Sequence, residues 1–163
     1  MMCLAENNNF ERTTIERVAG IYVQGDDGKL SLSAGRDITL TGAQVVNSGN
    51  ESRTLLNAGR DLNLNTVTTS ASDHLVWDKD NWLKQSVTQQ TGSEITGGGS
   101  VLMTAARDVN AQAATGTAGG SLTVGADRDI HITTATESSE FESKHKYTSS
   151  DFSRRRRLPR TMW

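Results

Sequence analysis

Four Arg–Asp pairs are the residues of this chain whose charges and spacing suggest chemistry. They lie at positions 36–37, 60–61, 107–108 and 128–129. A recurring carboxylate can bind a cation, act as an acid or base on a sugar polymer, or form ion pairs. These uses require different arrangements of the acids, so the surrounding residues decide among them.

The local patterns argue against a metal site and against catalysis. The calcium-binding repeat GGxGxDxUx is absent around Asp26, Asp27 and the four Arg–Asp pairs. Enzymes that cleave polysaccharides cluster their carboxyl groups at set separations, whereas these acids recur once per repeat. The three histidines, His74, His131 and His145, are far apart and lack the spacing of metal ligands. We therefore expect no catalytic residue, no metal and no cofactor.

Each Arg–Asp pair lies inside a longer phrase that recurs four times. The first copy, residues 28–43, reads GKLSLSAGRDITLTGA, and the others occupy residues 52–67, 99–114 and 120–135. The first two pairs lie 24 residues apart and the last two 21, whereas the middle gap is 47. A period in the low twenties indicates a solenoid. The middle gap then corresponds to about two periods, one of them degraded or replaced.

The alternation within a copy predicts a corner at the Arg–Asp pair. Apolar side chains occupy even positions before and after Arg36, so one straight strand would bury its guanidinium at high cost. A bend avoids this, since Gly35 tolerates positive φ and Asp37 favours a turn. The predicted structural corner residues are Gly35, Arg36, Asp37, Gly59, Arg60, Asp61, Arg107, Asp108, Arg128 and Asp129.

A strand–corner–strand unit cannot bury its own apolar face, so the copies must stack. Parallel stacking at about 4.8 Å aligns equivalent residues into ladders. Like charges then come into register, and Arg and Asp side chains can pair between successive rungs. We therefore predict an all-β solenoid with rungs of about 20–24 residues.

Residues 68–96 depart from the repeat. They contain Trp77 and Trp82 on either side of a DKDN turn at residues 78–81, which is typical of a β-hairpin projecting from the solenoid. Aromatic residues are only 5% of the chain, so these two tryptophans are the candidates for contact with a partner. The alternative is that they pack back on the solenoid.

The remaining segments complete the predicted organisation. Residues 1–19 are an irregular lead-in, 20–67 and 97–136 are solenoid rungs, and 68–96 are the excursion. Residues 137–163 are a polar and then basic tail that we expect to be disordered. The tail contains four arginines at positions 154–157. An anionic surface could attract this run, but it lacks the interleaved aromatic residues of a specific nucleic-acid site.

Composition fits one thin, elongated domain. The chain has 163 residues, of which 34% are hydrophobic, too few for one large round core. Cys3 is the only cysteine, so an intrachain disulfide is excluded. The sequence contains no signal peptide and no apolar run of about 18 residues that would span a membrane.

The four copies resemble the haemagglutinin repeats of filamentous haemagglutinin and of CdiA-type contact-dependent growth inhibition proteins. The similarity covers roughly residues 12–150 and includes the segment GSEITGGGSVLMTAARD, which leads into the third copy. The resemblance implies a right-handed parallel β-helix. It also implies a very large exoprotein of Gram-negative bacteria, exported by two-partner secretion and used for adhesion or to present a C-terminal toxin.

We therefore expect a non-enzymatic, structural fragment of a secreted adhesin or toxin carrier. The alternatives are a β-helical polysaccharide-degrading enzyme and a haemolysin-like toxin segment. The expected partners are a host or neighbouring bacterial cell surface and, for the full-length protein, an outer-membrane secretion transporter. The open ends of the stack also predict self-association.

Overall fold

The computed structural model describes residues 8–147, which form β-strands joined by turns and contain no helix. The all-β class predicted from the sequence is confirmed. None of these residues forms a helix long and apolar enough to cross a membrane.

Twelve of the strands form three parallel sheets of four strands each. The first sheet contains β2 (Gly20–Val23), β5 (Gln44–Asn47), β10 (Glu94–Gly97) and β13 (Thr115–Ala118). The second contains β3 (Lys29–Ala34), β6 (Arg53–Ala58), β11 (Ser100–Ala105) and β14 (Leu122–Ala126). The third contains β4 (Ile38–Thr41), β7 (Leu62–Asn65), β12 (Asp108–Gln112) and β15 (Asp129–Thr133).

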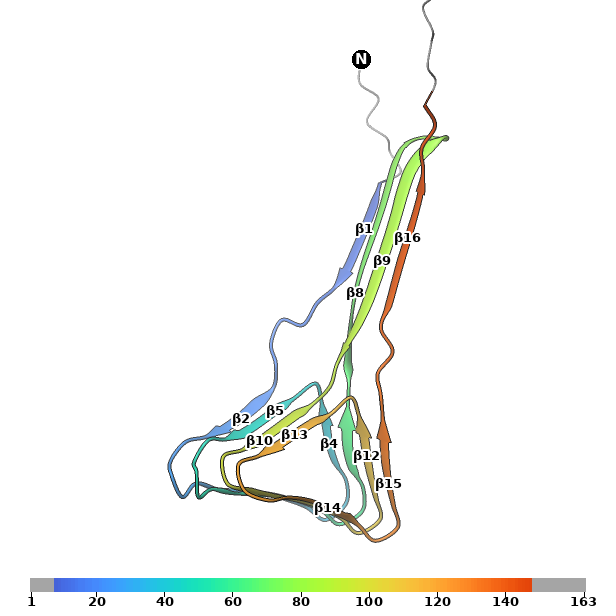
Figure 1. Ribbon diagram of the computed structural model, residues 1–163. Coiled ribbons are helices and arrows are strands. Elements are labelled where there is room, and N and C mark those ends of the chain that lie inside the picture. Colours follow the sequence, from blue (N-terminus) through green and yellow to red (C-terminus); the bar gives the residue numbers. More distant parts are fainter. Residues whose placement is uncertain (1–7, 148–163) are drawn as a thin grey trace, which may run out of the picture.

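The chain visits the three sheets in the same order four times. We call each visit a layer: layer 1 is β2, β3 and β4, layer 2 is β5, β6 and β7, layer 3 is β10, β11 and β12, and layer 4 is β13, β14 and β15. The sheets enclose a triangle, and we call this part the prism (Figure 1). The Arg–Asp corner separates the second strand of each layer from the third, and the first strand of each layer forms the third side of the triangle.

Alternation places one face of every strand inside the prism. Because the register is parallel and unshifted, equivalent inward residues form rows along the stack, such as Leu32, Leu56, Met103 and Val124. The buried residues belong chiefly to layers 2 and 3, as with Leu56, Leu62 and Ile95, all 0% exposed. Only these layers have neighbours on both sides. In layer 4, Ile132 is 78% exposed.

The other four strands form an antiparallel sheet that projects from one corner of the prism, and we call it the arm (Figure 1). Its strands are β1 (Asn9–Thr13), β8 (Val67–Asp78), β9 (Asn81–Thr91) and β16 (Ser138–Lys144), in the order β1-β8-β9-β16. The central pair β8 and β9 is a long hairpin whose turn lies at the far end of the arm.

Two expectations for the chain ends are wrong within the described residues. Residues 1–19 are not entirely an irregular lead-in, since β1 pairs with β8. Residues 137–163 are not entirely a disordered tail, since β16 pairs with β9. Every residue of β1 and β16 is exposed, so neither strand has a buried face that would impose alternation on its sequence. Backbone pairing to the hairpin forms them instead. The arginine run at 154–157 and Cys3 lie outside the described residues.

Of the two alternatives for the period between the second and third copies, degraded or replaced, the structure shows the second, because the predicted hairpin occupies this segment. Strand β10 pairs directly with β5, and β11 pairs with β6, so layers 2 and 3 are adjacent. The hairpin is an insertion at the corner between them. It lengthens the sequence between two copies but adds no layer to the stack.

Glycines at the corner between the first and second sheets permit the close approach of layers. A Cβ built on Gly119 would collide with the carbonyl oxygen of Gly98, and one on Gly98 would lie 2.5 Å from the carbonyl oxygen of Gly49. A side chain at these positions would therefore force the layers apart.

This contact predicts that Gly119→Ala destabilises the chain by about 1–3 kcal/mol, the usual cost of overpacking. Gly125→Ala in the same layer is the matched control, because its Cβ would find its nearest neighbour, the Thr104 methyl group, at 3.9 Å. Urea denaturation followed by far-UV circular dichroism measures both. Equal midpoints for the two variants would contradict the close-packing argument.

Candidate functional site

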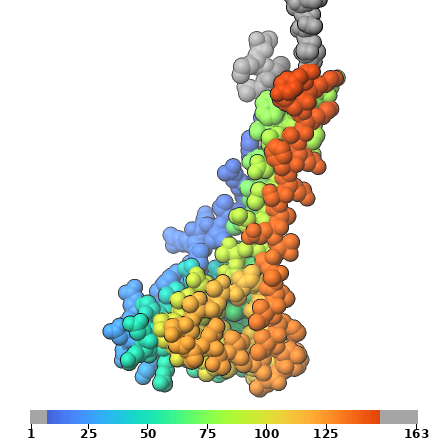
Figure 2. Space-filling view, in the orientation of Figure 1, coloured from blue at the N-terminus to red at the C-terminus, as the bar shows by residue number. Residues whose placement is uncertain are grey.

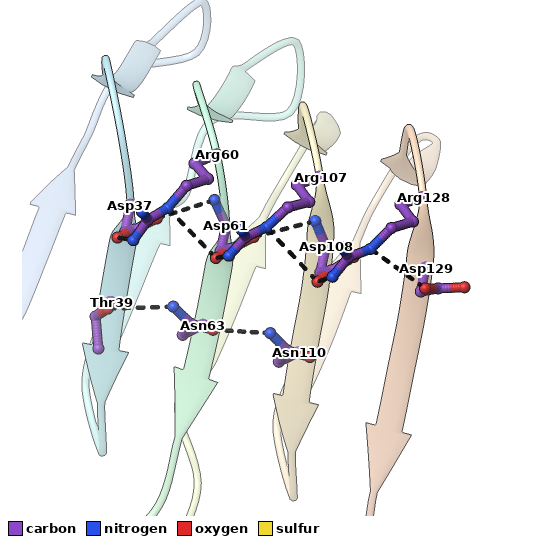
Figure 3. Close-up of polar contacts among 10 residues, drawn as sticks. All are labelled: Asp37, Thr39, Arg60, Asp61, Asn63, Arg107, Asp108, Asn110, Arg128 and Asp129. Carbon is purple, nitrogen blue, oxygen red and sulfur yellow. Dashed lines mark hydrogen bonds and ion pairs between the residues drawn. The ribbon is translucent and has the colours of Figure 1, made fainter.

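The four corners form a continuous ladder of ion pairs along the prism. The arginines of layers 2, 3 and 4 each bind the aspartate of the layer before through two parallel hydrogen bonds (Figure 3). The Nε–H groups donate to the carboxylates at 2.7 Å for Arg60 and Asp37, 2.7 Å for Arg107 and Asp61, and 2.8 Å for Arg128 and Asp108. The pairs are bidentate, the geometry in which guanidinium and carboxylate match best.

The same carboxylates also bind the backbone of the next layer. The Asp61 N–H donates to Asp37 Oδ1 at 3.2 Å, and the Asp108 N–H donates to Asp61 Oδ1 at 3.3 Å. One aspartate therefore accepts from both the side chain and the main chain of its neighbour. The corner bend makes both contacts possible. It directs the side chains of Asp37 and its counterparts toward the next layer, while the apolar side chains on either side of the corner still point into the prism.

These contacts fix the charge state of the ladder. The hydrogen bond from Arg60 lowers the pKa of Asp37, and the bond from Arg107 lowers that of Asp61. The same bonds raise the pKa values of Arg60 and Arg107, and the bond to Asp108 raises the pKa of Arg128. Asp61 and Asp108 are each only 7% exposed. Both inner carboxylates are thus covered and bound to an arginine, which suits them to structure rather than to proton transfer or cation binding.

The outermost charges of the ladder differ from the inner ones. Within residues 8–147, Arg36 has no carboxylate within ion-pair distance. At the other end the Asp129 side chain is 56% exposed, and its nearest cation is its own neighbour Arg128, whose Nε lies 3.4 Å away. The ladder therefore ends in an arginine without a partner carboxylate on one side and an aspartate without a bidentate partner on the other.

A second, uncharged ladder runs beside it on the outer face of the third sheet. Asn63 donates to Thr39 Oγ1 at 3.5 Å, and Asn110 donates to Asn63 Oδ1 at 2.9 Å (Figure 3). The next member of this row is His131, which is exposed. No group of three or more His, Cys, Asp or Glu side chains within residues 8–147 is placed to hold a metal ion.

The structure places both candidate tryptophans at the far end of the arm. Trp77 is 62% exposed, and it lines a shallow groove with Asp78, Asn81, His145 and Lys146. Trp82 is half-buried, and the Lys84 ammonium lies 5.4 Å from its ring centroid, a cation–π contact. Both residues lie beside the turn between β8 and β9. This turn is at the end of the arm far from the prism (Figure 1), so the two side chains do not pack back on the prism.

Sequence reasoning missed three further aromatic side chains of this region. Phe10 is 59% exposed, Phe141 is 63% exposed, and Tyr147, just beyond β16, is 85% exposed. Phe10 and Phe141 lie in the two edge strands that the sequence did not predict. Their only signal in the sequence is an aromatic residue within a polar stretch, which does not by itself indicate a strand.

One of the comparisons with known proteins gives a match. The family model described as Hemagglutinin repeat matches residues 77–154. This segment is a haemagglutinin repeat. The comparisons with curated proteins and with solved structures found no match.

The matched haemagglutinin repeat corresponds to one structural unit of the chain. It contains strand β9, which runs toward the prism, then layers 3 and 4, then strand β16, which runs away from it. The segment before it has the same order, with β1, layers 1 and 2, and β8. Residues 8–147 thus form two stacked units of the same design, and the family match falls on the second.

The ladder predicts loss of stability in acid. The pKa values of Asp37 and Asp61 lie below the ordinary value of 3.8 in the folded chain. The stabilisation is therefore complete above about pH 4 and is lost as the pH falls through the lowered values. Urea denaturation between pH 2 and pH 7 should give a level free energy of unfolding near neutral pH and a decline below pH 4. A free energy independent of pH in that acid range would contradict the role of the ladder.

The contribution of each aspartate to the free energy of unfolding should depend on its position in the ladder. Asp61→Asn removes the carboxylate bound by Arg107, so it should lower the urea midpoint at pH 7 and weaken the decline in acid. Asp129→Asn is the matched control at the exposed end and should change the midpoint much less. If both variants lowered the urea midpoint equally, the ion pairs between layers would contribute no more stability than a single exposed aspartate.

Proposed function

We propose that the prism is a segment of a right-handed parallel β-helix that serves as a non-enzymatic stalk in a secreted filamentous exoprotein. The observation that carries this proposal is the ladder, because the recurring charged groups of the inner layers are bound to one another. A group that is fixed in a bidentate pair is poorly suited to bind a substrate or a cation. The haemagglutinin-repeat match at residues 77–154 supports the same conclusion.

The repeat family points to the filamentous haemagglutinin type of exoprotein, which acts at or beyond the cell surface. Within such a protein, stacked layers give length at little cost in sequence, since each layer adds one strand to every sheet. We infer that the longer protein leaves the cell through an outer-membrane transporter of two-partner secretion. Adhesion and delivery of a toxin, as in the CdiA type, are the two roles that a stalk of this kind supports.

The end of the arm is the part that we assign to contact with a host or neighbouring bacterial cell. Trp77 presents most of its side chain to solvent, and so does Tyr147, which follows the end of β16. Aromatic side chains with a polar handle are favoured at binding surfaces because they bury a large area and also donate hydrogen bonds. The end of the arm lies far from the prism (Figure 1), which leaves it accessible to a partner.

Replacing both Trp77 and Trp82 with Ala should lower binding of the fluorescently labelled chain to host or bacterial cells at least severalfold. The far-UV circular dichroism spectrum should stay the same, because the tryptophans lie outside the core. The control is Leu102→Ala, which removes a 41% exposed apolar side chain from the outer face of the prism. Unchanged binding of the double variant, or an equal loss in the control, would exclude the arm as the contact surface.

A further inference from the structure

All four sheets of the molecule have the same order along the stack. In each sheet of the prism one edge strand belongs to layer 1 and the other to layer 4. In the arm, one edge is β1, which leads into layer 1, and the other is β16, which follows layer 4. Each of the two ends of the stack therefore exposes one edge strand from every sheet.

Strand directions at the two ends are compatible with each other. The strands of the prism are all parallel, so β2, β3 and β4 of one molecule can continue the sheets that end in β13, β14 and β15 of another. In the arm the directions alternate, with β1 running toward the prism, β8 away, β9 toward and β16 away. A β1 strand placed beside β16 of another molecule would be antiparallel to it and would continue the alternation.

The molecule already contains this junction once. Where the second unit stacks on the first, β5 pairs with β10, β6 with β11, β7 with β12 and β8 with β9. Four strand pairings therefore form together at one boundary. The end of the second unit repeats the design of the end of the first, so the same boundary can form again with a second copy.

The charges at the two ends are complementary. Each arginine of the ladder binds the aspartate of the preceding layer, as Arg60 binds Asp37. Arg36 of a following molecule would occupy the corresponding position beside Asp129, the one aspartate of the ladder that receives no bidentate arginine within residues 8–147. In a head-to-tail contact, Arg36 of one molecule and Asp129 of the other would thus form the ion pair that each lacks within its own molecule.

The apolar rows are complementary in the same register. At the layer 4 end, Ile130 is 45% and Ile132 is 78% exposed, and both line an opening into the core. Their rows begin in layer 1 with Ile38 and Leu40. Figure 2 shows layer 4, in orange, as the face turned to the viewer, with layer 1, in blue, at the opposite side.

The arm supplies one more matched pair. Phe10, Asp73, Gln85 and Phe141 form a single row across its four strands, with a phenylalanine at each edge. In a head-to-tail stack Phe141 of one molecule would lie beside Phe10 of the next. Cross-strand aromatic pairs of this kind stabilise antiparallel sheets.

We propose that the chain associates head to tail with further copies of itself, the layer 1 end of one molecule continuing all four sheets at the layer 4 end of another. The contact joins two different surfaces and so does not close on itself, which extends it into a filament. It goes beyond the proposed function, because it depends on the ends of the stack and not on what the arm binds.

Charge reversal tests the contact. The wild-type chain should show a concentration-dependent mass of at least two copies in sedimentation velocity at low salt. Arg36→Asp and Asp129→Arg should each raise the dissociation constant at least tenfold, since each places like charges together. The double variant Arg36→Asp/Asp129→Arg restores the opposite pairing and should recover most of the affinity. Circular dichroism verifies that each variant is folded, and wild-type cell binding is measured separately, so failure of association leaves the proposed function intact.

Disulfide trapping tests the register. Thr39 and His131 end one outward row of the third sheet, so a stacked pair of molecules places them side by side. In a Cys3→Ser background, a mixture of the Thr39→Cys and His131→Cys variants should form mixed disulfide dimers on oxidation, whereas neither variant alone should. A monomer at every concentration, failure of the double variant to recover affinity, or cross-links mainly between two copies of the same variant would overturn the proposal.

Discussion

Parallel pairing between layers is the interaction on which the rest of this structure depends. Backbone hydrogen bonds hold neighbouring strands about 4.8 Å apart, so a residue in one layer faces its equivalent in the next. Apolar residues gain from this register, as the row of Leu32, Leu56, Met103 and Val124 shows. Charged residues are penalised unless opposite charges alternate along the stack. The corner meets that requirement because the arginines of layers 2, 3 and 4 each bind the aspartate of the preceding layer, so that opposite charges alternate along the stack.

The same register explains why the two ends of the prism differ from its middle. Layers 2 and 3 are covered on both sides and contain the fully buried side chains, such as Leu56 and Ile95. Layers 1 and 4 have one neighbouring layer each, which leaves Ile132 exposed and the ladder incomplete at Arg36 and Asp129. No layer of this repeat is built to cover the outermost layer of the stack. Its ends are therefore the surfaces at which we propose association with another copy.

The arm and the prism are separate parts of the structure, and we propose a different role for each. Its four strands leave or enter the prism at one corner, between successive pairs of layers, so the sheet of the arm grows along the same axis as the prism. The prism supplies the rigid base, and the hairpin carries Trp77 and Trp82 to the far end. In a longer stack of such units, each pair of layers would contribute two strands to a continuous lateral sheet. This arrangement supports the assignment of length to the prism and of contact to the arm.

The sequence by itself determined the strands on either side of the corner and the outward position of Arg36. Alternation around Arg36 leaves no other low-cost placement for its guanidinium. The DKDN turn likewise marked the hairpin, because turn chemistry is local. Only the tertiary structure decided that the hairpin is inserted between adjacent layers and that β1 and β16 complete the arm. Those two strands have no buried face, so their side chains show no alternation that would predict a strand. Their position follows from backbone pairing with a strand distant in the sequence.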